Sequence, residues 1–253
     1  MRTHLLLAVT LSSVPALASE PLQSAFGPGE QSVFEVSYLG VPTGTVVITV
    51  GLQMEQFGKP IWPIVCTAST DLSIYPVRDR YISYWDWGQN RNIGSEFTRD
   101  ENKKKDREKM RYDFSKKKIF ATKQKESNKA EDFIYDAQEG VVDLAGAAFS
   151  LRNASLEVGS EYKLPIFTGL VTYEMSAKVA GKEKLTTRQG DKNVLKVSFT
   201  AGGWTGGLAP KRALTLWVLD DPTHLPVKFE AELMVGSIVA ELTTSYPGRD
   251  FTR

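Results

Sequence analysis

Apolar and polar residues alternate along much of the chain, which is the period-2 pattern of strands buried on one face. The clearest case is residues 226–235, where apolar positions alternate with mostly charged ones (Val227, Phe229, Ala231, Leu233 and Val235 against Lys228, Glu230, Glu232 and Met234). Gly236-Ser237 then predicts a tight turn, and the apolar phase resumes at residues 238–242. We therefore expect an antiparallel hairpin here.

Strands of the same kind recur from one end of the chain to the other. They are predicted at residues 33–38, 45–54, 61–71, 78–87, 93–100, 108–114, 117–123, 160–167, 171–180, 182–188, 193–200 and 213–219. Short strands at this spacing indicate a mainly β fold, a large curved antiparallel sheet that forms a roll or an open barrel.

One central segment departs from the pattern. Residues 143–152 are rich in Ala and Leu, and Asp143 is a suitable N-cap, so we expect one short helix there. The spacing places Leu144, Ala147, Ala148 and Leu151 on its buried face. We predict a single β-rich domain over residues 19–253, with two β halves joined near 140–155 as the alternative.

The first 18 residues have the features of a secretory signal peptide. Arg2 precedes an apolar run from Leu5 to Val14, and Ala16-Leu17-Ala18 is a small-x-small cleavage site. The run is shorter than the roughly 20 residues that span a bilayer. We expect cleavage after Ala18, no lipid anchor because Ser19 stands where a lipoprotein has Cys, no membrane span, and a periplasmic or secreted protein.

The charge of the chain is balanced and gives no general field for nucleic acid. The sequence has 31 basic and 30 acidic residues, and loss of Arg2 with the leader makes the numbers equal. Residues 99–125 are strongly charged and predict an exposed hairpin with turns near Asn102 and Ser115. Its lysines either guard a solvated sheet edge or contact an anionic partner, through Lys103, Lys104 and Lys105.

Residues suited to catalysis are few. Cys66 is the only cysteine, so no internal disulfide can form, and it lies in an apolar run. His224 is the only histidine after the leader, beside Asp220, Asp221 and Pro222, a combination typical of a turn. We predict no metal site, no cofactor and no catalytic residue, and favour a protein that is not an enzyme. A hydrolase using Asp220, Asp221 and His224 is kept as an alternative.

Aromatic residues gather in two places. In one predicted strand and its neighbour, Trp62, Tyr81, Trp85 and Trp87 either pack in a strand covered on both faces or line a groove for a lipid or sugar. In the other place, Trp204 stands in a glycine-rich loop at residues 202–207. These five residues are our candidates for ligand binding.

Several motifs in a fixed order resemble an exported bacterial family known only as a domain of unknown function. The opening motifs are Gly29-Glu30, residues 34–40 (FEVSYLG) and Gly44-Thr45; the closing ones are Leu216-Trp217, Asp220-Asp221, Leu225-Pro226-Val227 and Gly236-Ser237-Ile238. Between them come residues 75–79 (YPVRD), Asp143-Leu144, Leu151-Arg152 and Gly159. The resemblance implies a β protein of the cell envelope and supplies no catalytic residues. A looser likeness is to periplasmic lipid and lipoprotein carriers, in which a curved sheet wraps an apolar cavity beside a helix.

Export, the curved sheet and the aromatic strand favour a non-catalytic periplasmic protein that binds an envelope amphiphile or glycan. The first alternative is a structural or assembly factor that contacts an envelope protein through the lysine-rich hairpin or a sheet edge. The hydrolase is the second.

Overall fold

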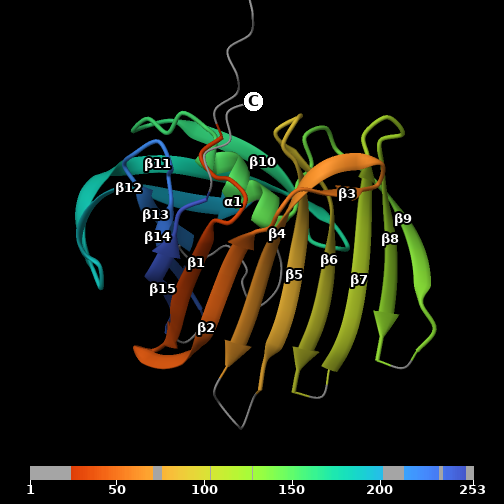
Figure 1. The fold of residues 1–253 in the computed structure, drawn as a ribbon, viewed down its shortest axis with the longest axis horizontal. Helices are drawn as coiled ribbons and strands as arrows, with labels where there is room; N and C mark the ends of the chain where they lie inside the picture. Colours follow the sequence, from red (N-terminus) through yellow and green to blue (C-terminus); the bar gives the residue numbers. More distant parts are fainter. Residues whose placement is uncertain are drawn as a thin grey trace, which may run out of the picture.

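A computed structural model describes residues 24–70, 76–102, 104–126, 128–201, 214–233 and 236–248. Their architecture is one curved antiparallel sheet with a short helix, as the alternating pattern predicts (Figure 1). The strands are β1 Gln31–Tyr38, β2 Val41–Val50, β3 Met54–Gln56, β4 Lys59–Thr70, β5 Arg78–Asp86, β6 Arg91–Glu101, β7 Lys104–Asp113, β8 Lys118–Lys125, β9 Glu131–Asp136, β10 Glu161–Phe167, β11 Thr172–Thr187, β12 Gly190–Ala201, β13 Leu214–Leu219, β14 Pro226–Glu232 and β15 Ser237–Tyr246.

The sheet consists of two meanders joined by a long-range pairing. Strands β1 to β9, with β3 off the main path, form the first meander, and β10 to β15 form the second. β15 pairs with β1 along its length, so both meanders belong to one sheet. β9 and β10 do not pair, and the sheet therefore does not close into a barrel.

The helix α1 Leu144–Arg152 links the two meanders in sequence and packs against both. Asp143 caps it by accepting a hydrogen bond from the Gly146 amide at 2.6 Å, as predicted. Phe149 packs with Trp62 and Trp85 of the first meander, while Leu151 packs with Val179, Val197 and neighbours of the second. The predicted buried face is wrong at Leu144, which is 53% exposed, because Phe149 and Gly146 take the inward positions.

Three strand predictions differ from the structure. Residues 171–180 and 182–188 form one long strand, β11, with a bulge between Val179 and Gly181. The strand predicted at 45–54 is wrong beyond Val50, where β2 ends, and β3, which begins at Met54, and β9 lie where no separate strand was predicted. The turns near Asn102 and Ser115 are present between β6 and β7 and between β7 and β8.

Ion pairs across strands neutralise much of the charged hairpin region. Lys109 pairs with Glu96 at 2.7 Å and Arg99 with Asp106 at 3.2 Å. Lys104 and Lys105 are exposed at the β6–β7 turn, and Lys105 lies 3.8 Å from Asp100. Lys103 is outside the described residues, so contact with an anionic partner stays a prediction. Within the described part of the chain, no helix has the length and apolar character needed to cross a membrane.

Candidate functional site

The aromatic residues of β4 and β5 form a core beneath α1. Trp62 and Trp85 are direct cross-strand partners and are 1% and 0% exposed. Phe26 packs edge-on against both, at ring-centre distances of 6.1 and 5.5 Å, and Trp87 stacks on Trp62 at 5.8 Å. Packing with protein side chains thus accounts for Trp62 and Trp85, and their role in ligand binding stays a prediction.

The opposite face of β5 is also covered. Ile82 and Tyr84 pack with Ile61, Ile93 and Phe57, the last of which lies in the β3–β4 turn. This short hairpin, which the sequence pattern missed, explains why aromatic residues occur on both faces of one strand. Trp204, the fifth candidate, lies outside the described residues.

A buried polar cluster surrounds the start of α1. Asp143 Oδ2 accepts a hydrogen bond from Asn92 Nδ2 at 2.8 Å, while its Oδ1 accepts the capping bond. Burial raises the pKa of the Asp143 carboxyl to about 6, and burial beside this carboxylate raises the pKa of Tyr81 and Tyr112 well above the usual range. Tyr81 thus lies beside the helix cap, and its polar neighbours anchor α1 to the first meander.

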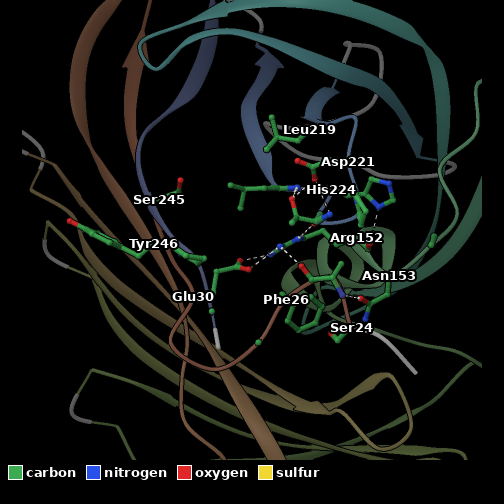
Figure 2. Close-up of a pocket in the computed structure, with 18 of the residues that line it drawn as sticks. Ser24, Phe26, Glu30, Arg152, Asn153, Leu219, Asp221, His224, Ser245 and Tyr246 are labelled. Atoms are coloured by element: carbon green, nitrogen blue, oxygen red, sulfur yellow. Dashed lines mark hydrogen bonds and ion pairs between the residues drawn. The ribbon is translucent and has the colours of Figure 1, made fainter. Parts of the chain in front are cut away.

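A cleft of about 840 Å³ lies where α1 ends and is the candidate binding site (Figure 2). Four segments line it: residues 24–30 before β1, residues 152–155 at the end of α1, residues 219–225 between β13 and β14, and residues 245–248 at the end of β15. We call residues 24–30 the N-terminal strap. Because these segments are far apart in sequence, the cleft exists only in the folded sheet.

Arg152 is the central residue of the cleft floor. Its guanidinium donates to both carboxylate oxygens of Glu30, at 2.5 and 3.0 Å, and to the carbonyls of Thr223 and Ala25, each at 3.0 Å. Its charged end also lies 5.2 Å from the ring centres of Phe26 and Phe149. Figure 2 shows Arg152 and Glu30 pointing at one another, with the 221–224 turn on one side. Arg152 therefore ties the strap, the helix end and the turn together.

The neighbouring residue Asn153 holds the strap from the other side. Its Oδ1 accepts a hydrogen bond from the Ala25 amide at 2.9 Å, and its Nδ2 donates to Asn90 Oδ1 at 2.6 Å. The β5–β6 turn, the helix end and the strap thus form one connected network at the cleft.

The Asp220–His224 segment is a turn whose polar side chains each have separate partners. Asp220 pairs with Lys182 at 2.8 Å, and Asp221 Oδ1 accepts hydrogen bonds from the amide and hydroxyl of Thr223 at 2.9 and 2.6 Å. His224 Nδ1 lies 2.8 Å from the Arg152 carbonyl, which can only accept, so Nδ1 carries a proton and donates this hydrogen bond. This arrangement matches the predicted turn, and the use of Asp220, Asp221 and His224 by a hydrolase stays a prediction.

The remaining polar groups of the cleft are mostly uncharged. Ser24 Oγ is buried and has no hydrogen-bond partner among the described residues. Ser155 and Ser245 add hydroxyl groups, and Asp221 is an exposed carboxylate.

Cys66 lies outside the cleft, and burial raises the pKa of its thiol to about 12. Within the described ranges, no group of three or more His, Cys, Asp or Glu side chains has the arrangement of a metal site.

The fold and cleft define a class: a β protein built on one large open antiparallel sheet, with a helix packed inside the curve and a cleft at the helix end. The chain belongs to the family described as protein of unknown function (DUF3108), whose model matches residues 33–243. This confirms the resemblance to a family of unknown function. The likeness to lipid and lipoprotein carriers stays a prediction. No curated protein sequence matches the chain.

One solved structure supports the fold. A β-barrel-like protein of the domain of unknown function DUF1849 from Brucella abortus superposes with a TM-score of 0.59 at 7% identity, covering 88% of this chain and 98% of that one. A Bacteroides fragilis protein with a YmcC-like fold aligns with a TM-score of 0.32 at 12% identity, covering 89% of this chain and 99% of that one. The first comparison shows a shared fold, and the second carries no weight.

Several of the motifs that carry the family resemblance meet at the cleft. Glu30 of the Gly29-Glu30 motif and Arg152 of the Leu151-Arg152 motif form its ion pair, and the turn from Asp220 to Leu225 lies beside them. The sequence pattern did not join these residues because Glu30 and Arg152 are 122 positions apart. The signal available in the sequence was that both residues belong to motifs that carry the family resemblance.

Proposed function

We propose that this is an exported, non-catalytic binding protein that holds a neutral, hydroxyl-rich component of the cell envelope, a glycan, in the cleft at the end of α1. One observation carries the proposal. The buried cation of the cleft, Arg152, gives four of its five N–H donors to Glu30 and two backbone carbonyls, whereas hydroxyl groups and one carboxylate remain for a ligand. Export rests on the predicted leader.

The character of the lining favours a glycan over an anionic ligand. Recognition of phosphate or carboxylate depends on Arg or Lys with donors to spare. Here Arg152 forms four hydrogen bonds within the protein, and His224 donates its Nδ1 proton to a carbonyl. Sugar hydroxyls, which both donate and accept, match the remaining serine hydroxyls, Asp221 and the second ring nitrogen of His224.

The packing inside the sheet favours a glycan over an amphiphile. A bound acyl chain needs an apolar cavity. Inside the curve, Phe149 and Leu151 of α1 instead meet tightly packed side chains such as Trp85 and Val197, which are 0% and 1% exposed. The cleft has a mixed lining, in which apolar residues such as Phe26, Leu219 and Leu225 lie among serine, threonine and asparagine side chains.

The test is calorimetric titration of residues 19–253 with neutral oligosaccharides released from bacterial envelopes, with sonicated anionic lipid as the competing ligand class. Ser245→Phe places a ring in the cleft and should weaken glycan binding at least tenfold. Ser237→Phe, at the other end of the same strand, is the matched control and should bind normally. Lipid binding without glycan binding, or equal effects of the two variants, would overturn the proposal.

A further inference from the structure

We infer that the free edge of β9 is a docking site for an extended protein segment of the pattern basic–x–apolar–x–basic, which adds to the sheet as a further strand. This inference is independent of the cleft and its ligand. Addition of a strand to an exposed sheet edge uses the unpaired backbone groups for affinity and the side chains for specificity.

The two ends of the sheet differ in how they are protected. At β10, the edge is covered in part by the chain before α1: the Val142 amide donates to the Pro165 carbonyl at 3.0 Å, and the Phe167 amide donates to the Val142 carbonyl at 2.9 Å. At β9, the described residues provide a pairing partner only on the β8 side. Figure 1 shows β9 as the last strand of its row, with its outer edge open.

β9 carries neither lysine nor proline, and its only charged residues are acidic. Natural edges carry lysine or proline, which prevent pairing with other chains. β9 instead has three consecutive apolar residues, Phe133, Ile134 and Tyr135, and Ile134 is 64% exposed. The acidic residues at both ends of β9 disfavour pairing with an acidic strand and leave the apolar centre open to a basic one.

The strand is held ready for pairing by contacts on its inner face. Phe133 and Tyr135 stack at a ring-centre distance of 6.2 Å, and the Lys123 ammonium lies 5.6 and 5.7 Å from their ring centres. Tyr135 also packs on Phe167 of β10 at 5.1 Å. An incoming strand therefore meets an ordered edge and does not have to order it.

The outward side chains set the pattern of the partner. Asp132, Ile134 and Asp136 alternate along one face, and all three are exposed. Asp136 Oδ1 accepts a hydrogen bond from Lys118 at 2.6 Å and Asp132 Oδ1 accepts one from the Thr122 hydroxyl at 2.7 Å, so an incoming basic residue would share each carboxylate with a residue of β8. Side chains directly opposite in an antiparallel pair lie on the same face, where opposite charges stabilise and like charges destabilise. A partner with basic residues opposite Asp132 and Asp136, and an apolar residue opposite Ile134, satisfies all three positions. A second copy of β9 centred on Ile134 would place Asp132 against Asp136, which excludes self-pairing in that register.

The test uses a synthetic peptide, acetyl-Thr-Lys-Thr-Val-Thr-Lys-Thr-amide, and its counterpart with both lysines replaced by glutamate. In ¹⁵N-labelled protein at low salt, the lysine peptide should shift the amide signals of β9 and bind at least tenfold more tightly than the glutamate peptide. Asp132→Lys/Asp136→Lys should reverse this preference, and Ile134→Lys should weaken the lysine peptide at least fivefold. Glu161→Lys on β10 is the matched control and should change neither the affinity for the lysine peptide nor the preference for it over the glutamate peptide.

Circular dichroism establishes that each variant is folded before titration. Equal affinity for the two peptides, shifts confined to the cleft, or an unaltered preference in the charge-swapped variant would each overturn the inference. Dimerisation of the free protein through β9 would do so as well, because it would make a second copy the occupant. Ser245→Phe should leave peptide binding intact, so failure of the cleft proposal and failure of this one are separable.

Discussion

Asp143 places a carboxylate in the core, where the charged form is poorly solvated. Its hydrogen bonds from Asn92 and Gly146 only partly offset the burial, and the pKa of the group rises from the ordinary 3.8 to about 6. Near pH 5 the folded protein therefore keeps a proton that the unfolded chain has released. The protonated carboxyl therefore stabilises the folded state relative to the unfolded chain. This contribution to the unfolding free energy is fully present below pH 3.8, is lost as the pH rises through about 6, and amounts to roughly 3 kcal/mol.

We predict that Asp143→Asn flattens this pH dependence. Asparagine also caps helices, so α1 is retained, while the titrating group is gone. Urea unfolding at intervals between pH 4 and pH 7 should show a smaller decline in unfolding free energy for the variant than for the wild type. Asp79, whose pKa is also raised to about 6, chiefly by burial, is present in both proteins, and its contribution cancels in the difference. Parallel curves for the two proteins would contradict the prediction.

The Arg152–Glu30 pair gives a second prediction about single residues. Glu30→Gln keeps the shape of the side chain but leaves the buried Arg152 cation uncompensated, which should lower the unfolding free energy by about 3–5 kcal/mol. Glu35→Gln is the control, because its pair with Arg188 is exposed and should matter by about 1 kcal/mol or less. Chemical denaturation measures both, and equal small losses would mean that the pair does not hold the strap.

At the scale of the elements, the alternating pattern predicted most hairpins because a half-buried strand shows its burial in every second residue. β9 escaped prediction because Glu131, Asp132 and Asp136 leave only three apolar residues, packed along an edge. β11 was predicted as two strands because Gly181 looked like a break, whereas the structure accommodates it as a bulge. The local pattern of apolar and polar residues thus predicts where strands lie. It does not show which strands form the edges of the sheet or where bulges occur.

The cleft was beyond prediction for a different reason. Its residues come from the strap, the helix end, a turn and the end of β15. Only the pairing of β15 with β1 brings the turn and the end of β15 near the strap. The turn chemistry around Asp221 was predictable from local sequence. The ion pair between Glu30 and Arg152 depends on tertiary structure and has no local signal.

Gly44 in β2 tests the packing between neighbouring strands. A Cβ atom at this position would lie 2.2 Å from the Ser69 carbonyl oxygen of β4, and backbone cannot yield as a flexible side chain can. We predict that Gly44→Ala lowers the unfolding free energy by about 1–3 kcal/mol through overpacking. Gly181→Ala, where no atom lies within 4 Å of the added methyl, should be neutral or slightly stabilising. Urea midpoints measure the stability of both variants, and similar losses of unfolding free energy in both would contradict the prediction, because only the methyl group at residue 44 meets a close contact.

At the scale of the whole molecule, the pairing of β1 with β15 makes two meanders into one sheet. The same seam positions the strap beside the end of β15, where Gly248 lies close to the Gly27 carbonyl. α1 spans the seam from within, since Phe149 packs on the first meander and Leu151 on the second. The proposed glycan cleft therefore depends on both meanders, whereas the β9 edge belongs to the first alone.

We therefore predict that the two meanders unfold together. Hydrogen exchange measured by mass spectrometry across a urea series should show peptides from β4–β5 and from β12–β13 losing protection at the same midpoint. Ala240→Pro removes a ladder hydrogen bond from the middle of β15, next to Val36 of β1, and should separate the two midpoints or unfold the protein. Ile238→Val, a mild change in the same strand, should leave the midpoints coincident. Separate midpoints in the wild-type protein would instead mean that the chain folds as two β halves joined near residues 140–155, with the cleft at their interface.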